Sequence, residues 1–108
     1  MKGRVVAQQL EPITPGEILL EEFLKPNSIS QEPLSRDIDV PKSRISGIVH
    51  GTRSVTADTA LRLATYFGTS ARFWMNLQDE YDLRLLRQTT WPEVEPRIRK
   101  HNAEKAAI

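Results

Sequence analysis

Apolar residues between positions 14 and 88 recur at spacings of three and four, which is typical of α-helices that bury one side. Five such runs follow one another, with no convincing pair of strands among them. The pattern therefore predicts an all-α domain of five helices over residues 14–88. An N-terminal arm (1–13) precedes this domain, and a C-terminal extension (89–108), with room for a short helix within 93–103, follows it.

Each expected helix has its own start or stop signal. Thr14 and Glu17 form a capping box, with Pro15 in the first helical position. The later signals are Ser30, Thr56 and Ser70 as caps, with Gly51 and Gly68 as left-handed ends. The side chains expected to be buried are Ile18, Leu19, Phe23, Leu24, Leu34, Ile38, Ile45, Ile48, Val49, Leu61, Leu63, Ala64 and Phe67.

Residues 30–51 carry the most informative part of the pattern. Two short helices are expected around a tight turn at Asp39 and Val40, and Pro41 takes the first position of the second helix. The apolar residues of that helix share one side, and its polar residues lie off this stripe. Such a layout is typical of a helix-turn-helix, whose second helix enters the DNA major groove. We therefore expect the chain to bind double-stranded DNA.

A small polar set supplies the expected DNA contacts. Arg44 suits a bidentate contact with guanine, and Lys42 suits a guanine or a phosphate. Gln31 opens the first helix and Arg53 follows the second, where both suit phosphates. His50 is better explained as a helix-end residue than as a base reader. The candidate DNA-binding residues are Gln31, Lys42, Ser43, Arg44, Ser46 and Arg53.

Charge adds to this picture through its distribution. The net charge of +1 over 108 residues argues only weakly for a nucleic-acid partner. Residues 36–53, however, hold four basic and two acidic residues, and residues 87–108 hold five basic and three acidic ones. A local basic face can dock on phosphates even when the whole molecule is nearly neutral. Ordinary solvated surface explains the excess in the tail equally well.

The fifth helix carries a broad apolar stripe. Core packing is one explanation of this stripe. The other is a seam between two copies, since helix-turn-helix proteins usually bind DNA as twofold dimers. The candidate dimer-interface residues are Trp74, Tyr81 and Leu85.

Several function classes are disfavoured by the residues that are missing. Cysteine is absent and the two histidines lie far apart, so no metal site and no cofactor are expected. The sequence has no nucleophile–base pair and no glycine-rich phosphate loop, which argues against an enzyme. No apolar run is long enough for a membrane span or a signal sequence, so we expect a cytoplasmic protein.

The sequence closely resembles the HigA-type antitoxins over about residues 12–86. The pieces PGEIL, GTRSVTADTALRLA, YFGTS and FWMNLQ carry this resemblance in combination. These antitoxins belong to the Xre, or lambda-repressor-like, helix-turn-helix proteins of bacteria. The resemblance implies a five-helix homodimer that represses its own operon and neutralises a RelE-like mRNA interferase toxin of the HigB type. By position, it also assigns DNA contacts to Gln31, Lys42, Ser43, Arg44 and Ser46, with Arg53 as backbone support.

Three residues depart from the pattern of that family. Asp39 stands where glycine is usual, so the turn must place an aspartate in the left-handed region at some cost. Ser35 stands where alanine is frequent, and its hydroxyl must bond back to the helix. Arg72 occupies a first turn where an acidic residue suits the helix dipole better.

A stand-alone Xre-type transcription regulator is the alternative function. A small basic open reading frame beside the gene would favour the antitoxin. Both the arm and the tail are candidate contacts for a toxin.

Overall fold

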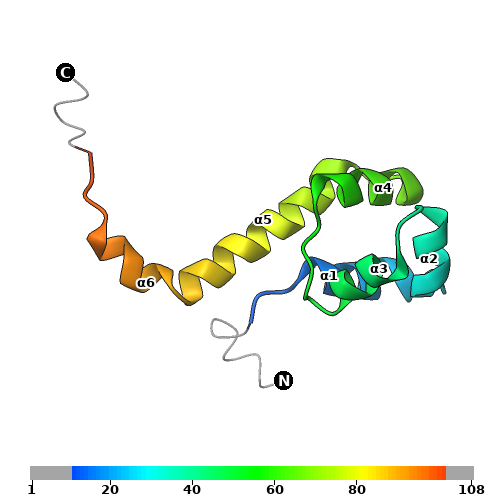
Figure 1. Cartoon of the computed structure of the whole chain (residues 1–108), viewed down its shortest axis with the longest axis horizontal. Helices are drawn as coiled ribbons and strands as arrows, with labels where there is room; N and C mark the ends of the chain where they lie inside the picture. Colours follow the sequence, from blue (N-terminus) through cyan, green and yellow to red (C-terminus); the bar gives the residue numbers. More distant parts are fainter. Residues whose placement is uncertain (1–10, 102–108) are drawn as a thin grey trace.

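The computed structural model describes residues 11–101, and it is helical throughout apart from loops and turns (Figure 1). Predictions that fall on residues 1–10 and 102–108 lie outside the described residues. The all-α fold class is confirmed over the part that is described. The elements in chain order are α1 (Pro15–Ile18), the π-helical η2 (Leu19–Leu24), α2 (Gln31–Asp37), α3 (Lys42–Val49), α4 (Ala57–Phe67), α5 (Ala71–Gln88), α6 (Trp91–Val94) and the 3₁₀ turn η3 (Glu95–Arg97).

The capping signals explain where most helices begin. The Thr14 hydroxyl accepts a hydrogen bond from the Glu17 backbone N–H at 3.1 Å, and the Glu17 carboxylate accepts one from the Thr14 N–H at 3.2 Å. Pro41 differs from the prediction by one position. It is the N-cap of α3, with extended backbone, so Lys42 is the first helical residue. The hydroxyls of Thr56 and Ser70 cap α4 and α5, and Gly51 and Gly68 have positive φ, as predicted. Ser30 occupies the N-cap position of α2, but its side chain makes no capping hydrogen bond.

The first helix changes its winding within its length. A single α-helix was expected from Pro15 to about Leu24, but the backbone widens to π-helical geometry from Leu19 onward. Backbone hydrogen bonds in this geometry join residues five apart, such as Lys25 N–H to the Leu20 carbonyl at 3.0 Å. The wider turn lets Leu19 and Leu24, also five apart, both lie fully buried.

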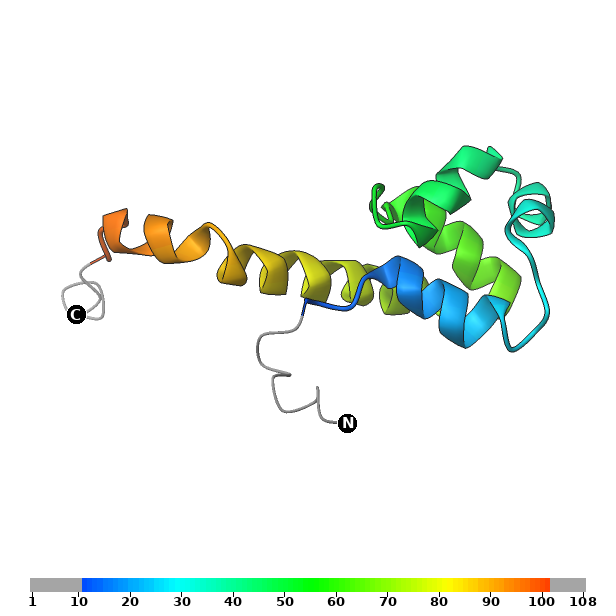
Figure 2. The same ribbon diagram turned by 90° about the horizontal axis from the view of Figure 1, so that it is seen from below.

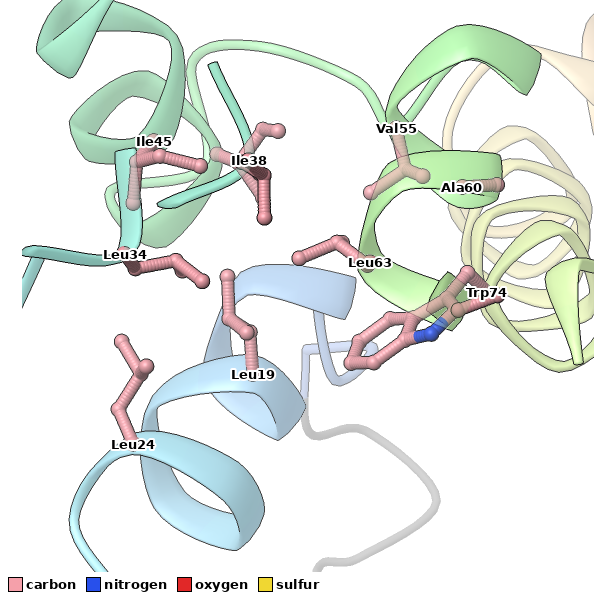
Figure 3. Close-up of a cluster of buried hydrophobic side chains, with 11 residues drawn as sticks. Leu19, Leu24, Leu34, Ile38, Ile45, Val55, Ala60, Leu63 and Trp74 are labelled. Carbon is pink, nitrogen blue, oxygen red and sulfur yellow. The ribbon is translucent and has the colours of Figure 1, made fainter. Parts of the chain in front are cut away.

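The core lies where the first helix, α2, α3 and α4 meet the start of α5 (Figure 3). Two residues predicted to be buried lie outside this core. Ile18 is only half-buried and does not pack against the core cluster. Leu61 is 60% exposed, because α4 turns that side away from the other helices. The fully buried residues of the core are Leu19, Leu24, Leu34, Ile45, Ile48, Ala60, Leu63 and Trp74.

Trp74 belongs to this core and not to a seam between copies. Its side chain has no exposed surface, and its ring lies 4.8 Å from that of Phe23 and 5.0 Å from that of Phe73. The indole N–H donates to the Thr69 hydroxyl at 2.8 Å, which satisfies the one polar atom of the ring. A side chain enclosed in this way offers nothing to a second copy, so the prediction that placed Trp74 in a dimer interface was wrong.

The second half of α5 leaves the domain and carries α6 at its far end (Figures 1 and 2). The radius of gyration is accordingly 18.1 Å, against about 13 Å for a compact chain of this length. The short helix of the extension begins at Trp91, earlier than the predicted 93–103, because Pro92 fits the first turn of a helix. We refer to residues 83–98, the part of the chain beyond the domain, as the projecting arm.

No helix within residues 11–101 combines the length and apolar character needed to cross a membrane.

Candidate nucleic-acid interface

The turn between α2 and α3 is built around one left-handed residue. Asp39 has a φ of +61°, as its departure from the usual glycine required. The Val40 backbone N–H bonds to the Ser35 carbonyl at 3.0 Å and closes the turn. The Ser35 hydroxyl, which is buried, donates to the Glu32 carbonyl at 2.7 Å, so it is satisfied within its own helix. Both departures are therefore accommodated within the turn.

Helix α3 has one side buried in the core and the opposite side turned to solvent. Ile45 and Ile48 are buried against the core, while Lys42 and Ser43 are exposed. Since successive residues of an α-helix are 100° apart, Ser43 lies near the middle of the exposed side, with Ser46 beside it. The predicted polar face is thus present, with Lys42 and Ser43 exposed and Arg44 and Ser46 partly exposed.

The α2 side of this face is a shallow hollow. It is formed by the first turn of α2 and the outward side of α3, so Gln31 comes together with Lys42 and Ser46. His50 also lines this hollow, and its Nδ1 lies 2.7 Å from the Ser46 carbonyl. That contact fits the expected helix-end role of His50, although its exposed ring reaches the same surface.

The α4 side of the face holds an ionic cluster that the sequence analysis missed. The Arg44 Nη1 lies 2.6 Å from the Asp58 Oδ2, and the Arg62 Nε lies 3.0 Å from the same oxygen. Arg62 also donates through Nη1 to the backbone carbonyls of Ile38 and Asp39, at 2.7 and 3.0 Å. The guanidinium of Arg44 is therefore attached, through α4, to the turn between α2 and α3.

Hydrogen bonds from Arg62 and Arg44 hold the pKa of Asp58 below its usual value. A carboxylate whose pKa is lowered on folding stabilises the protein above its unfolded pKa, about pH 4, and loses that effect as the pH falls through the lowered value. Asp58 is therefore ionised near neutral pH, and the pairing with Arg44 is intact there.

The loop after α3 is fastened at both ends. The backbone N–H groups of Thr52 and Arg53 both bond to the Gly47 carbonyl, at 2.9 and 3.1 Å. A Cβ atom on Gly47 would lie 3.1 Å from the Arg53 Cβ, so this glycine lets Arg53 pack closely over α3. At the far end, the buried Gln78 side chain accepts the Val55 N–H at 2.7 Å.

Three residues of this site escaped the sequence analysis. Asp58 and Arg62 carry the i,i+4 spacing of a helical ion pair, which was a usable signal. Their contacts with Arg44 and with the turn carbonyls join segments far apart in sequence, and no local pattern reports such contacts. Gln78 lies within the apolar stripe of α5. A glutamine in such a stripe must find a buried hydrogen-bond partner for its amide, and this was the signal that the sequence offered.

The predicted DNA-binding residues thus lie on one side of the molecule, but they are divided between two hollows. Gln31, Lys42 and Ser46 line the hollow beside α2, whereas Arg44 and Arg53 line a second hollow beside the start of α4. Ser43 is exposed between them. Within residues 11–101, no cluster of three or more potential metal ligands occurs.

Comparisons with known proteins agree with this geometry. The helix-turn-helix family model matches residues 20–74. Virulence-associated protein I of Dichelobacter nodosus is 49% identical over 80 residues, which is 74% of each chain. Antitoxin HigA-1 of Vibrio cholerae is 35% identical over 72 residues, covering 67% of this chain and 68% of the relative. A solved structure of the Pseudomonas aeruginosa antitoxin HigA with the higBA promoter is 44% identical, with a TM-score of 0.79, and covers 82% of this chain and 97% of that one.

Proposed function

Because the chain belongs to the helix-turn-helix family of HigA-type antitoxins, we propose that it binds operator DNA, represses its own operon and neutralises a HigB-type toxin. The observation that carries the DNA-binding part is the exposed polar side of α3, whose apolar back is locked into the core. In this proposal the protein acts in the bacterial cytoplasm, as a homodimer.

The polar side of α3 suits the major groove in shape and chemistry. A helix fits that groove, and short hydroxyl side chains such as Ser43 and Ser46 can approach base edges closely. Lys42 and Gln31, at the rim of the hollow beside α2, suit phosphates on one side of the groove. Arg53, packed over the end of α3, suits the opposite backbone.

We expect the substitution Lys42→Ala to weaken binding to DNA by about tenfold at low salt. Loss of one phosphate contact should also reduce the slope of log affinity against log salt by about one. Fluorescence anisotropy with the DNA directly upstream of the gene measures both quantities. Lys25→Ala is the matched control, because Lys25 pairs with Glu21 at 2.9 Å on the first helix, away from α3. An unchanged slope for Lys42→Ala would remove this residue from the DNA contacts.

The homodimer in this proposal is supported by the projecting arm. Leu83 and Leu86 are about half exposed, and Leu85 is 38% exposed, although all three are large apolar side chains. Gln78, Tyr81 and Leu85 lie along one side of α5, at successive spacings of three and four, and Leu85 lies past the point where the domain ends. In this proposal a second copy covers this surface, with Leu85 and the half-buried Tyr81 at the seam.

The toxin in this proposal is the product of a neighbouring gene. We expect co-expression with the chain to restore growth to cells that produce this small basic protein, and the two to co-purify. Lys42→Ala should still rescue growth, because DNA contact and toxin contact are separate tasks. Rescue without co-purification would point to repression alone. If neither occurs with any adjacent gene product, the chain is a stand-alone Xre-type regulator, which is the second candidate function.

A further inference from the structure

The ionic cluster beside α3 gives Arg44 a constraint that the other polar residues of this face lack. Its side chain is 27% exposed, and Asp58 holds its Nη1 at 2.6 Å. Among the hydrogen bonds of residues 11–101, the remaining N–H groups of Arg44 meet no protein acceptor. The guanidinium is therefore fixed at one edge and keeps donors for a ligand at the others.

Asp58 is itself held by a second arginine. The same Oδ2 atom accepts from the Arg62 Nε at 3.0 Å, and Arg62 is anchored on the carbonyls of Ile38 and Asp39. The position of the guanidinium of Arg44 is thus set by the turn between α2 and α3 through two intervening side chains.

We infer that Asp58 is a specificity-determining positioning residue, which orients Arg44 so that its free donors read one base on the operator. This inference rests on the proposed DNA-binding function. An arginine side chain that is already ordered loses less conformational entropy on binding, and this saving is about 0.5–1.5 kcal/mol for a long side chain. This entropy saving applies only where a base can accept hydrogen bonds from Arg44 in its fixed orientation. The saving therefore favours binding to the operator over binding to other DNA.

Asp58→Asn tests this role, because asparagine keeps a side-chain oxygen but loses the negative charge, which weakens the pairing of this position with Arg44 and with Arg62. We expect the affinity for the operator, mapped by footprinting upstream of the gene, to fall about three- to tenfold. Affinity for a scrambled duplex of equal length should stay constant or rise, since a negative charge near the phosphates is removed. The ratio of the two affinities should therefore fall, and Asp58→Glu should restore part of it.

A double-mutant cycle separates positioning from a general structural effect. In an Arg44→Ala background, Asp58→Asn should no longer change the affinity ratio. Glu80→Gln is the matched control, because Glu80 forms a similar exposed pair with Arg84, 3.3 Å away on α5. Thermal unfolding of each variant checks that the fold is kept.

The opposite outcomes overturn the inference. If Asp58→Asn lowers the ratio equally with and without Arg44, Asp58 acts through the turn and not through Arg44. If Asp58→Asn raises operator affinity, Asp58 withholds Arg44 from DNA; if it changes nothing, Arg44 needs no orientation. A wild-type protein that binds operator and scrambled duplex equally would instead refute the proposed DNA-binding function.

Discussion

The substitution Gly16→Ala should destabilise the protein by about 3 kcal/mol or more, although alanine is the better helix former by about 1 kcal/mol. A Cβ atom at this position would lie 1.8 Å from the Ile48 carbonyl oxygen and 2.8 Å from the Val49 Cα. Both are backbone atoms of α3, so no rotation of a side chain relieves the overlap. The first helix and α3 would have to move apart, which opens the core behind the DNA-binding face.

Thermal unfolding followed by circular dichroism measures this effect, and we expect the midpoint to fall by about 15 °C. Gly68→Ala is the matched control. Gly68 has a positive φ but open space around it, so alanine there should cost only about 1 kcal/mol of backbone strain. Equal losses for the two variants would show that the contact with α3 does not decide the stability. Operator binding by Gly16→Ala should fall as well, because the overlap lies directly beneath the DNA-binding helix.

The substitution Leu86→Glu should convert the proposed homodimer into monomers and lower operator affinity by about a hundredfold or more. In a twofold interface each copy carries the new charge, so a single change places two like charges in an apolar seam. A dimer binds two half-sites at once, and the second contact is made at high effective concentration. A monomer loses that advantage, even though its own DNA-binding face is unchanged.

Sedimentation gives the mass of each species, and anisotropy with the upstream DNA gives the affinity. Leu61→Glu is the matched control, because Leu61 is an exposed leucine on α4, outside the projecting arm, at 60% exposure against 49% for Leu86. Leucine and glutamate have similar helix propensities, so neither change should disturb its helix. A Leu86→Glu variant that remains dimeric would place the seam elsewhere on the molecule.

Features that depend on residues close together in sequence could be predicted, whereas features that depend on distant segments could not. The capping box at Thr14 and the left-handed ends at Gly51 and Gly68 are local, and all were predicted. The outcome was poorer where the environment depends on distant segments. The exposure of Leu61 and the complete burial of Trp74 depend on which side of each helix meets the rest of the domain. The spacing of apolar residues along one helix does not report which of its apolar side chains is buried most deeply.

The candidate site shows the same division. The residues of the polar face followed from the helix-turn-helix pattern, because spacing of three and four fixes which side is apolar. The pairing of Arg44 with Asp58 did not, since it joins α3 to α4 across a loop. The role of Gly16 was equally hidden, because the atoms it must avoid lie 32 positions further along the chain.

The loop between α3 and α4 has a consequence for insertions and deletions. Its first residues are bonded to the Gly47 carbonyl and its last, Val55, to the side chain of Gln78, so both ends have fixed positions only a few residues apart. An added or removed residue would break one of these attachments and either detach Arg53 from α3 or leave a buried backbone N–H without an acceptor. Unlike most surface connections, this one should tolerate changes of side chain far better than changes of length.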